Sequence, residues 1–152
     1  MYNREEAKQI RVNFWDQFKD YTMKRNRKTG RKGQWILNKT GINGLNLKFH
    51  FDNTIAIVGI DVETRNMDKR IDLYGKLESL QKQINKALGK NTQWEIEYTR
   101  ENNKSISRIY TSLEQVNIFD PECWNSVNMF FYDRMSGLEE FYQEYKDYLR
   151  YG

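Results

Sequence analysis

The chain has 152 residues, of which 30% are charged and 14% aromatic, and its mean hydropathy is −0.93. This amount of core-forming material excludes a disordered chain, and the lack of a long apolar run predicts a polar globular protein without a membrane span. The first residues contain no apolar signal-peptide segment, so we expect a cytoplasmic protein with no membrane partner. A single cysteine, Cys123, excludes an internal disulfide, and a single histidine, His50, argues against a zinc site.

Charge is distributed unevenly along the chain. The formal net charge is +4, yet residues 21–51 contain eight basic residues and no acidic one. From Asp120 onwards, seven acidic residues face three basic ones. The sequence therefore predicts a basic patch in the first third of the chain and an acidic last helix.

Helical periodicity marks residues 3–21. Ile10, Phe14 and Phe18 recur on one face, and Asn3 followed by Glu6 is typical of a helix start. Because like charges repel and glycine adds backbone freedom, we expect this helix to fray across residues 24–33 into an exposed loop.

Three strands are predicted next. Residues 35–37 form a brief apolar run, residues 45–51 alternate strictly, and residues 54–63 return after a turn at Asp52 and Asn53. The last of these strands ends at Asp61 and Glu63, so we expect its far end to be exposed.

The second half of the chain adds two helices and a hairpin. An apolar stripe over residues 67–88 predicts one long helix that stops at Gly89. Residues 94–99 and 105–113 alternate, with a turn at residues 101–104 between them. Asp120 and Pro121 open the last helix, which Ser136 and Gly137 are expected to kink or interrupt.

These elements predict a single α+β domain over residues 1–152, in the order α-β-β-β-α-β-β-α. The short connections favour a mainly antiparallel five-stranded sheet packed with three helices. The order is loosely like a restriction-endonuclease-like core, the PD-(D/E)XK nuclease fold, whose active site lies on its second and third strands.

The basic segment is the first candidate binding site. Lysine and arginine contact phosphates, and an aromatic side chain can stack on a base. A solvated loop is the alternative interpretation, because the tryptophan in the segment also suits the core. The candidates for nucleic-acid binding are Lys24, Arg25, Arg27, Lys28, Arg31, Lys32, Trp35 and Lys39.

Three carboxylates are the catalytic candidates: Asp52, Asp61 and Glu63. Asp61 and Glu63 share one strand face, Asp52 lies in the adjoining turn, and such a set could hold Mg²⁺ as the only cofactor. In PD-(D/E)XK nucleases a lysine follows the acid by two residues, whereas here Glu63 follows Asp61 and Arg65 follows Glu63. Arginine stays protonated and replaces that lysine poorly, so a solvated acidic strand end is the alternative, with no cofactor and no metal site.

The last helix carries more aromatic residues than one sheet face requires. Large apolar patches seldom stay solvated, so this excess predicts a homodimer or partner surface.

Four segments resemble one known family. They are Phe14-Trp15-Asp16-Gln17-Phe18, Lys39-Thr40-Gly41-Ile42, Ile106-Ser107-Arg108-Ile109-Tyr110, and Trp124 with Phe130-Phe131. Together they are similar to the bacterial domain-of-unknown-function family number 4268, from about Tyr2 to the last helix. The resemblance implies bacterial origin, an α+β module and a role near DNA-handling systems, and it supplies no catalytic residue.

Within the third of these segments, Arg108 is a candidate anion-binding residue. The alternative is pairing across the sheet with Glu95 or Glu97.

The sequence as a whole favours a non-catalytic binding or interaction module that contacts nucleic acid through the basic loop. A divergent PD-(D/E)XK-like Mg²⁺-dependent nuclease and a homodimerising protein-interaction domain are the alternatives.

Overall fold

The computed structural model describes residues 2–100 and 102–152, which form a single α+β domain. Within these ranges every helix is too short or too polar to span a lipid bilayer. The elements are α1 (Arg4–Thr29), β1 (Leu45–Phe51), β2 (Ile55–Val62), α2 (Met67–Glu78), α3 (Gln81–Leu88), β3 (Gln93–Thr99), β4 (Ser105–Glu114), the 3-10 turn η1 (Pro121–Cys123) and α4 (Trp124–Tyr151).

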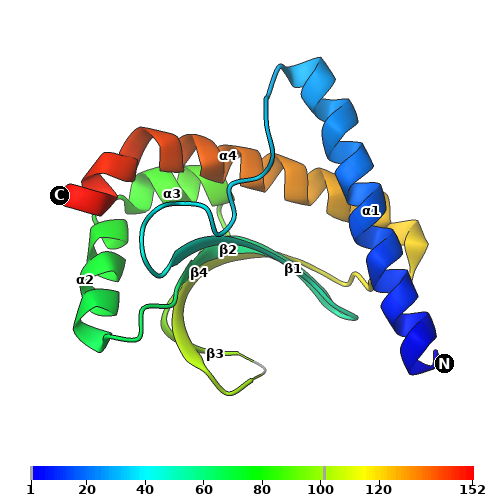
Figure 1. Ribbon diagram of the computed structural model, residues 1–152, viewed down its shortest axis with the longest axis horizontal. Helices are drawn as coiled ribbons and strands as arrows, with labels where there is room; N and C mark the ends of the chain where they lie inside the picture. The colour runs from blue at the N-terminus through cyan, green and yellow to red at the C-terminus, as the bar shows by residue number, and fades with distance from the viewer. Residues whose placement is uncertain (1, 101) are drawn as a thin grey trace.

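The sheet has four strands in the order β1-β2-β4-β3, and every neighbouring pair is antiparallel. In Figure 1, α3 and α4 lie above the sheet, α1 runs beside β1, and β4 and β3 curl away beneath. The antiparallel arrangement and both hairpins confirm the prediction. The turn of the second hairpin includes Glu101, which lies outside the described residues.

The expected fifth strand at residues 35–37 is absent, so the prediction of a five-stranded sheet is wrong. Its side chains pack against the core as expected, but its backbone is bound differently. The Ile36 amide donates to the carboxylate of Glu139 on α4 at 2.6 Å, and the Leu37 carbonyl accepts from the Leu47 amide at 3.0 Å. Leu37 also has a φ of 47°, which a strand does not allow. The Ile36 amide is therefore bound by a distant carboxylate and not by a neighbouring strand.

Helix α1 extends through the segment expected to fray. It reaches Thr29 and ends on Gly30, whose φ of 78° is the left-handed conformation that glycine favours. Two cations in the last turn suit the negative end of the helix dipole. Asn26 and Thr29 each hydrogen-bond the Tyr132 hydroxyl of α4 at 2.8 Å. These contacts outweigh the repulsion between neighbouring charges, so much of the predicted basic loop is helix.

The long helix predicted at residues 67–88 is two helices. Leu80 lies between α2 and α3 with φ −109° and ψ 25°, outside the helical range. Ser79 Oγ donates to the Lys76 carbonyl and hydrogen-bonds the Tyr148 hydroxyl of α4, which fixes the break. The element order is therefore α-β-β-α-α-β-β-α.

Helix α4, in contrast, runs without the interruption expected at Ser136 and Gly137. A Cβ added at Gly137 would lie 3.2 Å from the Ala87 carbonyl oxygen of α3. This glycine thus allows the two helices to approach closely and does not break α4.

The core lies between the sheet and the helices, and it is rich in aromatic rings. Phe14 and Phe131 are fully buried where α1 meets α4, and Phe14 packs edge-on against Phe51 of β1. The side-chain amides of Gln17 and Asn128 form two reciprocal hydrogen bonds across the same helix pair, at 2.9 and 2.8 Å. Packing and these hydrogen bonds fix α1 across α4.

Most of the aromatic residues on α4 belong to this core. Phe131, Phe141 and Tyr142 are buried, while Tyr148 and Tyr151 near the end of the helix are exposed. The expected excess of aromatic surface is therefore small, and self-association stays a prediction.

Gly59 in the central strand β2 lies directly beside Tyr110 of β4. A Cβ there would come within 2.5 Å of the Ile109 carbonyl oxygen and 2.6 Å of Tyr110 Cβ. We predict that Gly59→Ala lowers the free energy of unfolding by about 1–3 kcal/mol, because the two strands must separate to admit the methyl group. Urea unfolding followed by circular dichroism measures the change.

The matched control is Gly75→Ala on α2, where an added Cβ meets nothing within 4 Å. Alanine inside a helix is more stable than glycine by roughly 0.5–1 kcal/mol, so this variant should gain stability. Equal effects of the two substitutions would contradict the packing described for Gly59.

Candidate binding groove

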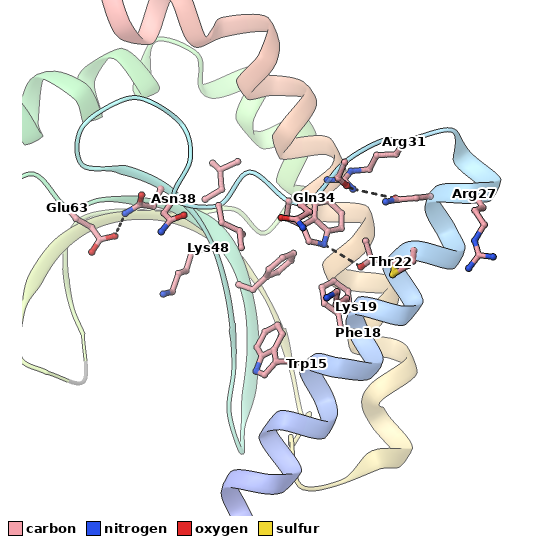
Figure 2. Close-up of a pocket in the computed structure, with 18 of the residues that line it drawn as sticks. Trp15, Phe18, Lys19, Thr22, Arg27, Arg31, Gln34, Asn38, Lys48 and Glu63 are labelled. Carbon is pink, nitrogen blue, oxygen red and sulfur yellow. Dashed lines mark hydrogen bonds between the residues drawn. The ribbon is translucent and has the colours of Figure 1, made fainter.

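A groove of about 1180 Å³ lies between α1 and the edge strand β1. We call it the α1–β1 groove. Figure 2 shows its residues on α1, on the following segment and on the sheet, with Arg27 towards one end and Glu63 towards the other. The lining residues are Trp15, Phe18, Lys19, Thr22, Met23, Asn26, Arg27, Arg31, Gly33, Gln34, Trp35, Leu37, Asn38, Asn46, Leu47, Lys48, Phe49, Glu63 and Arg100.

The charged side chains of the groove are mostly basic. Glu63 is its one acidic residue, and it is paired with Arg100. Lys19, Arg27 and Lys48 are exposed, and no ion pair joins them to any side chain in residues 2–100 and 102–152. The groove therefore carries an uncompensated positive charge that suits an anionic ligand.

Aromatic rings form the apolar part of the groove. Trp15, Trp35 and Phe49 are half-buried, and Phe18 is buried beneath them. The Arg31 guanidinium lies 3.6 Å from the centre of the Trp35 ring, and Phe18 lies parallel to Trp35. Trp35, the predicted stacking residue, is therefore occupied by its own neighbours.

The structure separates the eight predicted nucleic-acid candidates. Arg27, Arg31 and Trp35 line the groove. A guanidinium nitrogen of Arg25 lies 3.5 Å from a carboxylate oxygen of Asp133, and one of Arg31 lies 2.6 Å from a carboxylate oxygen of Glu139. Both cations are therefore paired with acidic residues of α4. The other candidates are exposed outside the groove lining: Lys24 and Lys28 on α1, and Lys32 and Lys39 in the segment after it.

Sequence reasoning missed Trp15, Lys19 and Lys48 as groove residues. Lys19, Met23 and Arg27 recur every four residues on α1, which is the spacing of one helix face. Extending the predicted helix to Thr29 would have placed Lys19 and Arg27 on that face. Lys48 on β1 gave no such signal, because its place in the groove lining depends on the tertiary fold.

The three predicted catalytic carboxylates are each held by local partners. Asp52 closes the β1–β2 turn, where its Oδ1 accepts from the Thr54 and Ile55 amides and its Oδ2 lies 2.7 Å from His50 Nε2. Burial alone would raise the pKa of Asp52, but these hydrogen bonds hold it below its ordinary value. Burial likewise opposes the lowered pKa of Glu63, which Asn46 and Arg100 stabilise as a carboxylate.

Asp61 corrects the expectation of an exposed acidic strand end, because its side chain is fully buried. Arg108 of β4 donates to both of its carboxylate oxygens, at 2.7 and 2.9 Å. Arg108 itself is 5% exposed and lies over the Tyr98 ring. Burial would lower the pKa of Arg108, but the bond to Asp61 raises it. Arg108, the predicted anion-binding residue, is therefore already paired with a carboxylate of the protein. That carboxylate is Asp61 on β2, and not Glu95 or Glu97.

No group of three or more metal-ligating side chains occurs in the part of the chain that the structure describes. Asp52, Asp61 and Glu63 are therefore not brought together as a metal site. The order of elements also departs from the nuclease-like order, because two strands and not three precede the first internal helix.

A curved antiparallel sheet with helices on one face defines the chain as an α+β domain. The chain belongs to the family described as a domain of unknown function, DUF4268, which matches residues 10–146. A search of curated proteins and a search of solved structures each find no match. The family membership confirms the resemblance, and it assigns no activity.

We predict that Asp61→Ala lowers the free energy of unfolding by about 3–5 kcal/mol, because it leaves the Arg108 charge buried without a partner. The double variant Asp61→Leu with Arg108→Met removes both charges and should be close to the unsubstituted protein or more stable. Guanidinium unfolding of the three proteins provides the comparison.

Asp133→Ala is the control, since it breaks the exposed pair with Arg25 and should cost no more than about 1 kcal/mol. A loss at Asp61 as small as the loss at Asp133 would show that the buried pair does not hold the sheet as described.

Proposed function

We propose that the protein is a non-catalytic binding module that holds nucleic acid in the α1–β1 groove. The uncompensated cations Lys19, Arg27 and Lys48 are the observation that carries this proposal. Phosphates are the anions that such dispersed lysine and arginine side chains bind through charge, with release of counterions.

The size and shape of the groove favour a polymer over a small molecule. Its volume of about 1180 Å³ exceeds the range of roughly 300–1,000 Å³ typical of small-molecule pockets. Exposed cations continue beyond it on α1, at Lys24 and Lys28, so a chain that leaves the groove meets further positive charge.

The chemistry of the groove suits binding without a reaction. Its acidic residue, Glu63, is engaged by Asn46 and Arg100, and its lowered pKa makes it a poor proton carrier near neutral pH. Asp61 and Arg108 are buried and hydrogen-bonded to each other, so neither charge faces the groove. These arrangements support the groove as the functional region in preference to the carboxylate set.

Fluorescence anisotropy with labelled single-stranded and duplex oligonucleotides tests the proposal. We predict binding whose affinity falls steeply between about 50 and 200 mM salt. The double variant Lys19→Gln with Arg27→Gln leaves two phosphates without a cation, so its log–log salt slope should be shallower by about 0.7–0.9 for each of these phosphates.

Lys82→Gln with Lys86→Gln changes the net charge equally on α3, away from the groove, and is the matched control. Equal weakening of binding in the two double variants would refute the groove as the site. Failure to bind any oligonucleotide at low salt, or equal retention of an acidic polyglutamate peptide, would refute nucleic acid as the ligand.

A further inference from the structure

We propose that the α1–β1 groove selects single-stranded nucleic acid, with an unpaired base stacked on the Trp15 ring. This inference rests on the proposed function and specifies its ligand. It depends on the orientation of one ring, on two amide side chains and on the lysine that follows the ring on α1.

The Trp15 ring is held firmly from one side. Phe131 of α4 lies parallel to it, with an interplanar angle of 8° and 5.7 Å between ring centres. Phe14 and Phe18 meet it edge-on from the same helix. Because these neighbours fix the ring, a ligand that stacks on it need not order it first.

The second face of Trp15 borders the groove. Figure 2 shows the side chain in the space between α1 and β1. The nearest ring on that strand, Phe49, is tilted by 48° at 6.3 Å, and Phe131 is the only ring of the described residues stacked parallel to Trp15. A planar base can therefore add to the aromatic stack on this side, as in other single-strand binding sites.

Two carboxamides of the groove are available to a base edge. Gln34 and Asn38 are exposed, and neither side chain has a hydrogen-bond partner within residues 2–100 and 102–152. By contrast, Asn46 donates to Glu63, and Asn26 accepts from the Tyr132 hydroxyl. A carboxamide both donates and accepts, so it can pair with the Watson–Crick edge that only an unpaired base presents.

A cation is placed to hold the backbone beside such a base. Lys19 follows Trp15 by one helical turn on α1, whereas Lys48 alternates with Phe49 on β1 and lies on the other side of that strand from Trp15 (Figure 2). In a duplex the bases are stacked and paired, so a base must leave the helix to reach a half-buried ring, at a cost of a few kcal/mol. The geometry thus favours a strand whose bases are already free.

Three ligands of equal length separate these contributions: a single strand, the same strand annealed to its complement, and an abasic strand with the same phosphates. We expect the single strand to bind more tightly than either of the other two. Trp15→Leu should weaken binding of the base-containing strand by about 5- to 100-fold and leave the abasic strand nearly unchanged.

Trp35→Leu is the matched control, because the Arg31 guanidinium already lies over the Trp35 ring and Phe18, Phe49 and Tyr132 surround it. Any weakening it causes should be equal for the two strands. Circular dichroism reports whether each variant folds, and Trp15→Phe, which keeps a ring, should restore most of the discrimination if the leucine variant does not fold.

Duplex or abasic strand binding as tight as that of the single strand would overturn this inference while leaving nucleic-acid binding in place. A Trp15→Leu effect that is equal for the two strands would also overturn it. Absence of binding to all three ligands would overturn the proposed function itself.

Discussion

The ion pair between Asp61 and Arg108 is the constraint on which the sheet depends. It joins the two central strands in a region from which water is excluded. Because a lone buried charge is costly, β2 and β4 are stable only in the register that brings these side chains together. A slip by one residue would turn Asp61 towards the helices, among apolar side chains. β1 pairs with β2 along its whole length, so the same ion pair sets where the edge of the groove lies.

A second buried carboxylate shapes the opposite wall. Glu139 of α4 accepts hydrogen bonds from Arg31 and from the Ile36 amide, both at 2.6 Å. It therefore draws the segment after α1 onto α4 and neutralises one of the basic residues that the sequence offered for phosphate binding. The residues of the family resemblance have comparable structural roles: Thr40 is buried and bonds the Leu45 carbonyl, and Arg108 belongs to the sheet. They account for the shape of the domain and leave the ligand to be inferred from exposed side chains.

Local periodicity was sufficient for the elements whose backbone bonds are also local. The alternation of residues 45–51 located β1, whereas the proline after Asp120 marks the 3-10 turn η1, which leads into α4 at Trp124. It failed where a distant side chain fixes the local structure: Glu139 accepts from the Ile36 amide, and the Tyr148 hydroxyl hydrogen-bonds the Ser79 hydroxyl at the break between α2 and α3. The candidate site followed the same division. The positive charge of residues 24–39 was visible in the sequence. Which of these cations are neutralised depends on acidic residues of α4, and the position of Trp15 across the groove from β1 depends on the whole fold.

The reciprocal amide bonds between Gln17 and Asn128 have a consequence for the kinetics of association. They join α1 to α4, and α4 packs on the sheet, so both walls of the groove belong to one rigid frame. A preformed site of this kind has no closing step, so in the proposed complex the ordering entropy would fall on the incoming strand. Under that proposal encounter is the slow step, and long-range attraction to the basic groove sets its rate.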